Sequence, residues 1–541
     1  MKQLESVVAH INDLQDGEMQ QVGVGETDVL LTRIDGKFYA VGAYCSHYQA
    51  PLAEGVLSGN NVICPWHNAC FNVISGDRQE PPGLDSLTPY QVRIEGEQVI
   101  VSVPESGSGL RTPLMAQSVP ATDARTFVVL GGGAAGANAV EALRAAGYQG
   151  RVVMLTAEDR LPYDRTWLSK DYFIGKVSRE QMPLRSSDFY ETHNIEVWLN
   201  KQVVRVDANA KIITFKDGDS LSYDALLVAT GGKARQLDVP GKELQNIFTL
   251  RSFEDTERIL TAAKPGAQAV VVGSSFIAME AASGLTQQGV KVTVISHSLP
   301  FKNILGEEIG QLFQQVHEIE GVSFRQGAIA QFEGNGKVAA VVLDNGDRLV
   351  VDLVIVGIGV QPATEFLDGM ELHSKDRSVL VDEYLRAAPG LYAAGDVACY
   401  PNWQTGEATR IEHWRIAAEQ GQVAAYNMAG QNVKFKGVPV FWTMQFKLPL
   451  RYVGHAEDWD EIIFDGELEK HKFIAFYVKN NQVIAAASSS RDTETAAIFE
   501  LLRLNQMPTP EVLRGGSVDL VSLVKLAKGE VAATKSVIDQ Q

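Results

Sequence analysis

The sequence predicts a multidomain protein in which an all-β domain precedes two α/β domains and an α+β C-terminal domain. The first hundred residues carry short alternating apolar runs such as TDVLLTRI and QVIVSVPE, separated by Gly, Asn and Pro, which is an all-β pattern. Two later stretches, beginning at TFVVLGGG and AQAVVVGSSF, have the order strand, glycine turn, helix and strand of a βαβ unit. After about residue 436 the pattern changes to short strands followed by a helix at ETAAIFELLRL.

Changes in composition predict the domain limits. A chain of 541 residues exceeds what one hydrophobic core usually supports, so several domains are expected. A stretch rich in Ser, Gly, Pro and Thr, without periodicity, predicts a linker after the all-β domain. The predicted order is an all-β domain at 1–104, a linker at 105–124, a first α/β domain at 125–248 and 358–435, a second α/β domain inserted at 249–357, and the C-terminal domain at 436–541.

The charge and the cysteine content exclude several classes of protein. A formal net charge of -18 argues against binding to nucleic acid or to an anionic membrane surface, because both need clustered Lys and Arg. The N-terminus does not have the pattern of a signal peptide, and no apolar segment is long enough to span a membrane. Only four cysteines occur, which indicates a reducing compartment. We therefore expect a cytoplasmic protein without a transmembrane segment.

Two short motifs in the all-β region predict a metal centre. Cys45 and His47 form a C-x-H pair, and Cys64 and His67 form a C-x-x-H pair, each in a loop between strands. A Rieske 2Fe-2S centre needs two Cys on one iron and two His on the other, so one Cys and one His from each loop fit it. A structural zinc site is the alternative, although zinc modules usually pair Cys with Cys and His with His.

This segment resembles the Rieske ferredoxins of oxygenase systems over nearly all of the first 104 residues. One departure is Asn68, where that family usually has Gly directly after the second ligand His. Ala69 and Phe71 stand where high-potential Rieske proteins have Ser and Tyr hydroxyls, so a low cluster potential is expected. Cys70 and Cys399 match no ligand position and are expected to be small core residues.

The first βαβ unit carries a dinucleotide-binding fingerprint of the Rossmann type. Gly131, Gly133 and Gly136 form G-x-G-x-x-G between the strand and the helix, and Glu158 ends the next strand. The glycines allow a tight turn, close approach of a pyrophosphate to the helix N-terminus, and helix–strand packing. Glu158 is then placed to accept the hydroxyls of the adenosine ribose.

The second unit carries a weaker version of this fingerprint. It reads Gly273, Ser275 and Ala278, and Phe276 begins the following helix, where it suits a gate over the cofactor. The next strand ends at His297 without an acidic residue that would select the 2′-hydroxyl of NAD, so NADH and NADPH both stay open, with His297 or Lys302 as candidate phosphate partners. A vestigial domain that no longer binds nicotinamide is the alternative.

The strings LPYDRTWLSK, ATGG, GIGVQP and YAAGDVA resemble the ferredoxin reductase and apoptosis-inducing factor branch of two-dinucleotide-domain flavoproteins over about residues 125–541. With the Rieske motifs in front, the whole chain resembles the apoptosis-inducing-factor-like proteins that carry an N-terminal Rieske domain. This resemblance implies FAD as the first cofactor and Lys170 and Glu280 as a catalytic charge pair near flavin N5. Further residues that it places at the flavin are Arg165, Ala229, Asp396, Glu412, His413, Trp414 and Trp442. Thr166 and Trp167 depart from the family motif, which usually has two prolines there.

The function implied is hydride transfer from NAD(P)H to FAD, followed by one-electron transfer to the 2Fe-2S cluster and to an acceptor, protein or small molecule, that the sequence does not identify. A redox sensor of the apoptosis-inducing-factor type, with little turnover, is one alternative. A Rieske oxygenase is another, but it needs a mononuclear iron held by two His and a carboxylate, and no such set is evident. Residues 125–398 contain no Cys, which excludes thiol chemistry at the flavin. The oligomeric state stays open, a homodimer included.

Overall fold

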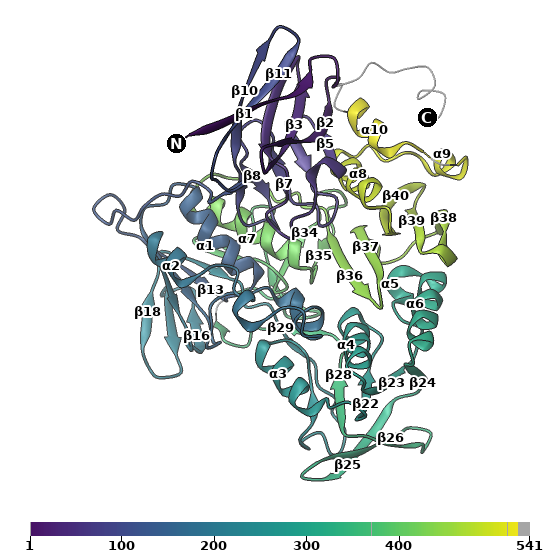
Figure 1. Ribbon diagram of the computed structural model, residues 1–541. Helices are drawn as coiled ribbons and strands as arrows, with labels where there is room; N and C mark the ends of the chain where they lie inside the picture. The colour runs from purple at the N-terminus through teal and green to yellow at the C-terminus, as the bar shows by residue number, and fades with distance from the viewer. Residues whose placement is uncertain (1, 369, 517, 528–541) are drawn as a thin grey trace.

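The computed structural model describes residues 2–368, 370–516 and 518–527, and within these ranges the chain forms an all-β domain, two α/β domains and an α+β domain (Figure 1). The all-β domain lies at the top of Figure 1, close to the C-terminal helices. Residues 528–541, the end of the predicted C-terminal domain, lie outside the described residues.

The N-terminal domain contains a large antiparallel sheet and a small sheet that carries the ligand loops. The large sheet has the strand order β1-β11-β10-β4-β3-β2, with bounds β1 (Gln3–His10), β2 (Glu18–Val24), β3 (Thr27–Ile34), β4 (Lys37–Gly42), β10 (Pro89–Glu95) and β11 (Gln98–Pro104). The small sheet comprises β5 (Val56–Ser58), β6 (Asn61–Ile63), β7 (Cys70–Asn72) and β8 (Arg78–Glu80) in sequential order. Apolar side chains from both sheets form one cluster that includes Cys45 and Cys64.

The segment predicted as a linker, 105–124, is tied to both of its neighbours. Within it, β12 (Leu110–Arg111) pairs with β9 (Ser86–Leu87) of the N-terminal domain. Further along, the N–H of Val119 donates to the carbonyl of Gln149 in the first α/β domain, at 2.8 Å. The connection is therefore held at both ends by backbone hydrogen bonds.

The first α/β domain is built on a sheet of order β15-β14-β13-β19-β33-β32, whose first five strands are parallel. Their bounds are β13 (Thr126–Leu130), β14 (Arg151–Leu155), β15 (Ile195–Trp198), β19 (Ala225–Val228), β32 (Arg386–Ala388) and β33 (Leu391–Ala393). Helices α1 (Ala134–Ala145) and α7 (Trp414–Met428) pack closely at Gly421 of α7. A Cβ at this position would lie 2.0 Å from the carbonyl oxygen of Ala135 in α1, so a larger residue does not fit. Smaller elements complete this domain: α2 (Ser187–Thr192), β16 (Val203–Asp207), β17 (Ile212–Phe215), β18 (Ser220–Ser222), β20 (Gly232–Ala234), β29 (Val360–Pro362), β30 (Leu367–Asp368), β31 (Val379–Leu380), β34 (Ala398–Pro401) and β35 (Ala408–Thr409).

The second α/β domain has a parallel sheet of order β21-β28-β22-β23-β24. Its elements are β21 (Ile247–Phe248), α3 (Phe253–Ala262), β22 (Gln268–Val272), α4 (Phe276–Gln287), β23 (Lys291–Ser296), α5 (Lys302–Leu305), α6 (Glu307–Ile319), β24 (Ser323–Gln326), β25 (Ile329–Asn335), β26 (Lys337–Leu343), β27 (Arg348–Val350) and β28 (Leu353–Val356). Strand β21 falls at the end of the segment predicted for the first domain, yet it pairs with β28 of the second.

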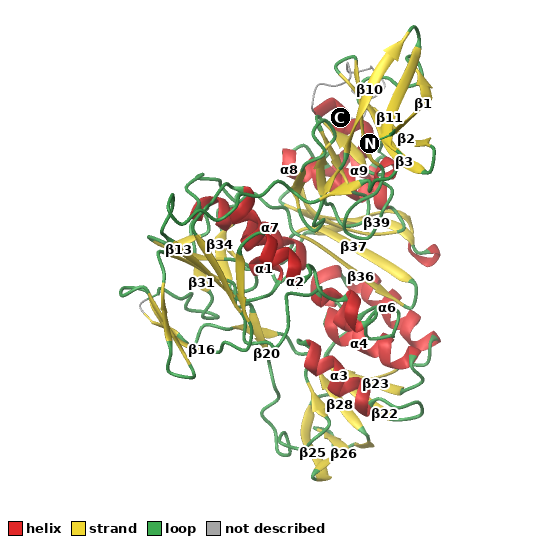
Figure 2. Ribbon diagram, turned by 60° about the vertical axis from the view of Figure 1, so that its left-hand side comes forward, coloured by secondary structure: helices red, strands yellow, loops and turns green. Residues whose placement is uncertain are grey.

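The C-terminal domain joins its neighbours through shared apolar clusters. Its sheet has the order β36-β37-β40-β39-β38, and the elements are β36 (Val440–Gln445), β37 (Leu448–Gly454), β38 (Glu461–Glu467), β39 (Lys472–Lys479), β40 (Gln482–Ser489), α8 (Asp492–Leu504), α9 (Pro510–Arg514) and α10 (Leu520–Ala527). Figure 2 shows this sheet between the N-terminal domain and helices α4 and α6. Leu450 packs in one cluster with Val271 of the second α/β domain, and Phe499 packs in another with Val56 of the N-terminal domain. Among the described residues, no helix is both long and apolar enough to cross a membrane.

Candidate functional site

Two loops of matching shape carry the four predicted metal ligands. The N–H of Cys45 donates to the carbonyl of Ala50, and the N–H of Cys64 donates to the carbonyl of Ala69, both at 2.9 Å. Each loop is therefore closed across five residues, with its cysteine at the start and its histidine inside the turn.

The four ligand side chains form two pairs. The Nδ1 atoms of His47 and His67 face each other at 3.1 Å, and the buried thiols of Cys45 and Cys64 lie near enough for each to shift the pKa of the other. No three His, Cys, Asp or Glu side chains that could hold a single metal ion gather in the described part of the chain. A Rieske centre binds one iron through two imidazoles and the other through two thiolates, so this pairing fits a 2Fe-2S cluster.

The surroundings favour the ligating protonation state at His67 and at one of the two cysteines. Burial and the neighbouring His47 lower the pKa of His67 well below its usual value, which keeps the ring neutral. Burial and the neighbouring Cys64 raise the pKa of Cys45 well above its usual value. Burial alone would also raise the pKa of Cys64, but the neighbouring Cys45 thiol, backbone N–H groups and the Arg451 charge outweigh burial and lower it. A thiolate, the form that binds metal, is therefore favoured at Cys64.

Asn68 supports the turn that the sequence left in question. Its φ of 58° lies in the left-handed region, where Gly is favoured and Asn is the best tolerated substitute. Its carbonyl oxygen accepts a hydrogen bond from Nη2 of Arg415 at 3.2 Å. The replacement of Gly by Asn therefore keeps the loop geometry.

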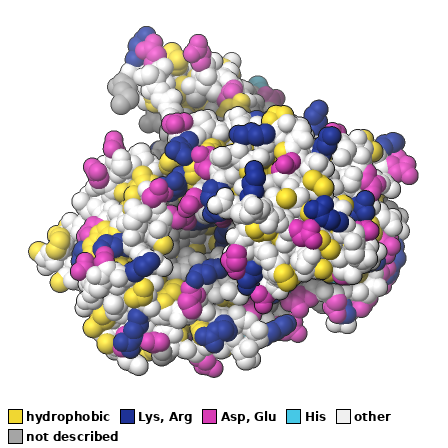
Figure 3. All heavy atoms as spheres, turned by 90° about the horizontal axis from the view of Figure 1, so that it is seen from below, with side chains coloured by type: hydrophobic (Ala, Val, Ile, Leu, Met, Phe, Trp, Pro, Cys, Tyr) yellow, Lys and Arg dark blue, Asp and Glu magenta, His cyan; other side chains and the backbone are white. Residues whose placement is uncertain are grey.

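A cavity of about 970 Å³ lies where the α/β domains meet the C-terminal domain. The space-filling view from below shows a hollow with basic and acidic side chains on its rim (Figure 3). The cavity is lined by most of the predicted cofactor residues, namely Gly131, Gly133, Glu158, Arg165, Lys170, Ala229, Ser275, Phe276, Glu280, Asp396, Glu412, His413, Trp414 and Trp442. Gly136 and Gly273 do not line the cavity. They lie in close contact with the backbone of Gly131 and of Gly357, respectively.

Two glycines of the first fingerprint are required by close backbone contacts, and the third lies at the open end of the helix. Gly131 has a φ of 125°, and a Cβ there would lie 2.2 Å from the carbonyl oxygen of Ala229. A Cβ on Gly136 would lie only 1.8 Å from the carbonyl oxygen of Gly131. Gly133 is the N-cap of α1, and the nearest heavy atom to a Cβ there is Nε of Arg165 at 4.0 Å. The helix N-terminus is thus left open to the cavity, as a bound pyrophosphate requires.

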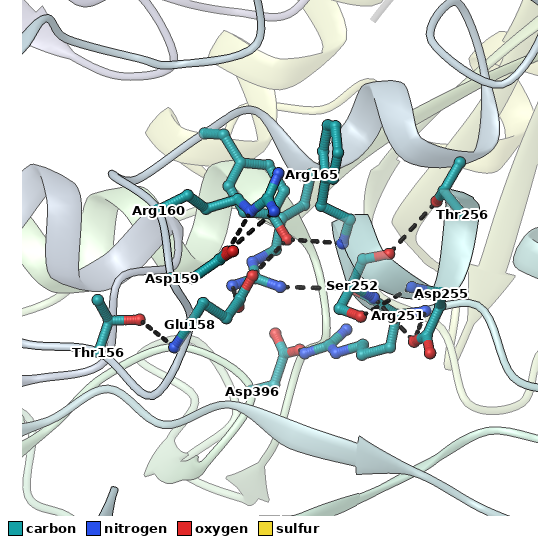
Figure 4. A network of polar contacts seen from close by, with 12 residues as sticks. Thr156, Glu158, Asp159, Arg160, Arg165, Arg251, Ser252, Asp255, Thr256 and Asp396 are labelled. Atoms are coloured by element: carbon teal, nitrogen blue, oxygen red, sulfur yellow. Dashed lines mark hydrogen bonds and ion pairs between the residues drawn. The ribbon is translucent and has the colours of Figure 1, made fainter. Parts of the chain in front are cut away.

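Figure 4 shows a polar network on the wall of this cavity. Glu158 forms an ion pair with Arg165 and accepts a hydrogen bond from the hydroxyl of Tyr163 at 2.8 Å. Asp396 forms an ion pair with Arg251 at 2.7 Å. Nη1 of Arg165 donates to the backbone carbonyl of Arg251 at 3.3 Å, which joins the two pairs. Arg251 carries no sequence signal for this position, because only the docking of two domains brings it beside Asp396.

The predicted pair of Lys170 and Glu280 is also brought together. Nζ of Lys170 lies 2.9 Å from a carboxylate oxygen of Glu280, whose side chain is 3% exposed. The hydroxyls of Ser169 and Thr443 donate to the same carboxylate. The ion pair places the ammonium group of Lys170 at the wall of the cavity.

The residues Glu412, His413 and Trp414 lie at the start of α7. Burial lowers the pKa of His413 to about 4, so its ring is neutral at pH 7. Burial also raises the pKa of Glu412, which forms an ion pair with Arg410 at 2.6 Å. The neutral ring of His413, the indole of Trp414 and the carboxylate of Glu412, which is paired with Arg410, suit contact with an uncharged aromatic cofactor.

The second fingerprint also begins a helix at the cavity. Gly273 has a φ of 107°, and a Cβ there would lie 2.4 Å from the carbonyl oxygen of Gly357. Ser275 is the N-cap of α4, and its hydroxyl donates to the same carbonyl at 3.0 Å. Phe276 stacks on Phe301 with ring centroids 4.4 Å apart.

The two residues predicted as phosphate partners of NADPH, His297 and Lys302, both lie at the surface. His297 is exposed, as its predicted role would need. Lys302 is exposed but pairs with Glu307 at 3.0 Å. Neither position supplies the guanidinium that usually accommodates a 2′-phosphate.

Trp442 connects the two sites. Its ring centroid lies 4.1 Å from that of His67, and the same side chain lines the large cavity. Opposite Trp442 on the adjacent strand, Arg451 donates from Nε to the carbonyl of Trp66 at 2.9 Å. The imidazole ligands of the N-terminal domain therefore face the cavity across one aromatic side chain.

Three family models match successive parts of the chain. The Rieske 2Fe-2S domain matches residues 5–91, the pyridine nucleotide-disulphide oxidoreductase model matches residues 125–421, and the reductase C-terminal model matches residues 440–524. These ranges follow the all-β, α/β and α+β parts of the structure.

Named relatives and solved structures agree with these matches. The chain is 40% identical to apoptosis-inducing factor 3 of Homo sapiens, over 92% of this chain and 84% of that protein. It is 33% identical to the ferredoxin–NAD(+) reductase component of the biphenyl dioxygenase system of Paraburkholderia xenovorans, over 74% of this chain and 98% of that protein. The fold matches a structure of the covalent putidaredoxin reductase–putidaredoxin complex with a TM-score of 0.71 and 29% identity, over 75% of this chain and 99% of that one.

Proposed function

Because this chain belongs to the pyridine nucleotide-disulphide oxidoreductase family and carries a Rieske 2Fe-2S domain in front of it, we propose that it passes electrons from NAD(P)H through FAD to its own cluster. The chain is a ferredoxin-reductase-like flavoprotein, and its cofactors are FAD, a Rieske 2Fe-2S cluster and NAD(P)H as substrate. Bound FAD accepts the two electrons of a hydride and releases them singly, and the cluster takes one electron at a time.

The residues of the chain supply binding, orientation and charge. The open N-terminus of α1 and Glu158 are suited to the pyrophosphate and the ribose of FAD. Lys170, held by Glu280, contributes a positive charge to the cavity wall, which favours the build-up of negative charge on the reducible ring.

The contact between Trp442 and His67 carries the proposal that electrons leave through the chain's own cluster. One side chain touches a predicted iron ligand and also lines the flavin cavity. We propose a one-electron acceptor after the cluster, protein or small molecule, which the ferredoxin reductase component among the relatives favours. We also propose a reducing compartment, since none of the four cysteines forms a disulfide.

Substitution of one cluster ligand tests the route. Cys45→Ser should remove iron and acid-labile sulfide, leave reduction of the flavin by NAD(P)H, and abolish reduction of a one-electron acceptor such as a cytochrome. The wild-type chain should contain FAD and two irons per chain. Full cytochrome reduction by a cluster-free variant would show that electrons leave directly from the flavin.

A second candidate function is redox sensing, which the 40% identity to apoptosis-inducing factor 3 favours. Slow turnover with every acceptor, together with a change in mass on reduction measured by light scattering, would support it. Rapid turnover at constant mass would exclude it.

A further inference from the structure

Tyr48 lies between a cluster ligand and a loop of the flavin domain. It directly follows the ligand His47, and its ring stacks on that imidazole with centroids 3.7 Å apart and planes 17° apart. On its other side it stacks on Trp167, at 5.6 Å and 18°. Tyr48 therefore joins the first ligand loop to a segment more than a hundred residues away.

The hydroxyl of Tyr48 lies in a buried polar site. It donates to Oδ2 of Asp164 at 2.8 Å and lies 3.2 Å from Oγ1 of Thr166. The other oxygen of Asp164 accepts from the N–H and the hydroxyl of Thr166, at 2.9 and 2.6 Å. Asp164 is only 4% exposed, and the same carboxylate lies 3.9 Å from Nε2 of His47. A carboxylate this deeply buried needs hydrogen-bond donors to balance its charge. Loss of the Tyr48 hydroxyl therefore destabilises the contact between the His47 loop and the loop of Asp164.

Asp164 also sets the geometry of the flavin side. It caps the short 3-10 helix η2 (Arg165–Ser169), which leads from Arg165 at the cavity wall to Lys170. Thr166 and Trp167, the two positions where the sequence departs from the flavin-loop motif, both contact Tyr48. The unusual sequence of this loop is therefore explained by the presence of the N-terminal domain.

From these contacts we propose that Tyr48 and Asp164 are positioning residues for electron transfer, which hold the His47 loop against the flavin loop so that the cluster is reduced without a domain movement. This inference rests on the proposed route from FAD to the chain's own cluster. In each transfer the flavin loses one electron and the oxidised cluster gains one. Together with Trp442 on His67, the Tyr48 contact holds both imidazole ligands against the reductase part of the chain.

The test uses Tyr48→Phe in the full-length protein loaded with FAD and cluster. Phenylalanine keeps both ring contacts and removes only the hydroxyl. In single-turnover stopped-flow work with NADH, flavin reduction should keep its wild-type rate. Reduction of the cluster, followed by freeze-quench electron paramagnetic resonance, should slow about tenfold, the factor that one hydrogen bond to a charged group typically supplies.

Tyr44→Phe is the matched control. The hydroxyl of Tyr44 donates to Asp28 at 2.7 Å within the same domain, and both partners belong to the N-terminal domain. This variant also loses a Tyr–Asp hydrogen bond, here an exposed one within a single domain, and should reduce its cluster at the wild-type rate. Equal slowing in the two variants would contradict a specific positioning role.

A second variant keeps the proposal testable if Tyr48→Phe loses iron. Asp164→Asn lies outside the cluster domain. When its amide oxygen keeps the two Thr166 donors, its NH2 group faces the Tyr48 hydroxyl in place of the carboxylate acceptor. Cluster reduction is expected to slow by a larger factor than flavin reduction, whose own rate reports any effect of the altered η2 cap. Wild-type cluster reduction in a fully loaded Tyr48→Phe or Asp164→Asn protein would overturn the positioning role and leave the electron route intact. Failure of the wild-type cluster to be reduced at all would instead overturn the proposed function.

Discussion

Replacing Lys170 by Met separates the structural role of its charge from its role in flavin reduction. Lys170 is 17% exposed and lies 2.9 Å from Glu280, which is 3% exposed. Its removal leaves a buried carboxylate held only by the hydroxyls of Ser169 and Thr443. Breaking one side of a buried pair costs about 3–5 kcal/mol, and with two donors remaining we expect about 3 kcal/mol. The measurement is urea unfolding of the flavin-loaded protein.

The double variant Lys170→Met with Glu280→Gln identifies the cause of any loss of rate. A neutral amide needs no cation, so most of the lost stability should return. The rate of flavin reduction should stay about a hundredfold below wild type in both variants, because a preorganised charge at the site of charge development contributes about that factor. Anaerobic stopped-flow at several NADH concentrations gives the rate and the nicotinamide affinity separately. Recovery of the rate in the double variant, or equal losses of rate and affinity, would refute the catalytic role of Lys170.

Three further predictions follow from the steric, redox and charge environments. Gly136→Val should abolish FAD binding, measured as flavin released on denaturation, because its Cβ would lie 1.8 Å from the backbone oxygen of Gly131; normal flavin content would contradict this. The wild-type cluster should have a midpoint near the lower end of a Rieske range of roughly -150 to +300 mV, and Ala69→Ser should raise it by adding a donor; an unchanged midpoint in a redox titration would show that exposure controls it. Burial raises the pKa of Glu419, which pairs with Arg415 at 2.7 Å, so the folded state holds its proton more tightly than the unfolded state does. The free energy of unfolding should therefore fall as the pH rises from the pKa of Glu419 in the unfolded state, about 4.3, through its raised pKa in the folded state. Glu419→Gln should flatten this fall, measured by urea unfolding at several pH values. Parallel pH profiles of the wild type and the variant would refute the prediction.

The local parts of both sites could be predicted from the sequence. Cys45 and His47 are two residues apart and share one turn, so their spacing alone restricts the metal centre that they can build. The same holds for Gly136, where a Cβ would meet the backbone oxygen of Gly131 in the same turn. Such features depend on contacts within one loop or one βαβ unit, which the sequence pattern encodes directly.

The partners of the buried charges could not be predicted in the same way. Arg251 reaches Asp396 across 145 positions of sequence, and Arg415 reaches the carbonyl of Asn68 across 347. Charged residues are usually exposed, and no pattern in the sequence identifies the few that become buried when two domains pack together. Only the packing of one domain on another decides which carboxylate meets which guanidinium.

The cofactors and the order of the domains could be predicted from the sequence, because cluster ligands and phosphate-binding glycines follow from short spacings within single loops. That the predicted cluster ligands lie beside the cofactor cavity is visible only in the tertiary structure. Trp442 meets His67, and Tyr48 meets Asp164, only because the C-terminal sheet and the flavin loop both pack against the N-terminal domain. These contacts form between segments that are independent in sequence, so their geometry depends on the shared apolar clusters that fix the domains relative to one another.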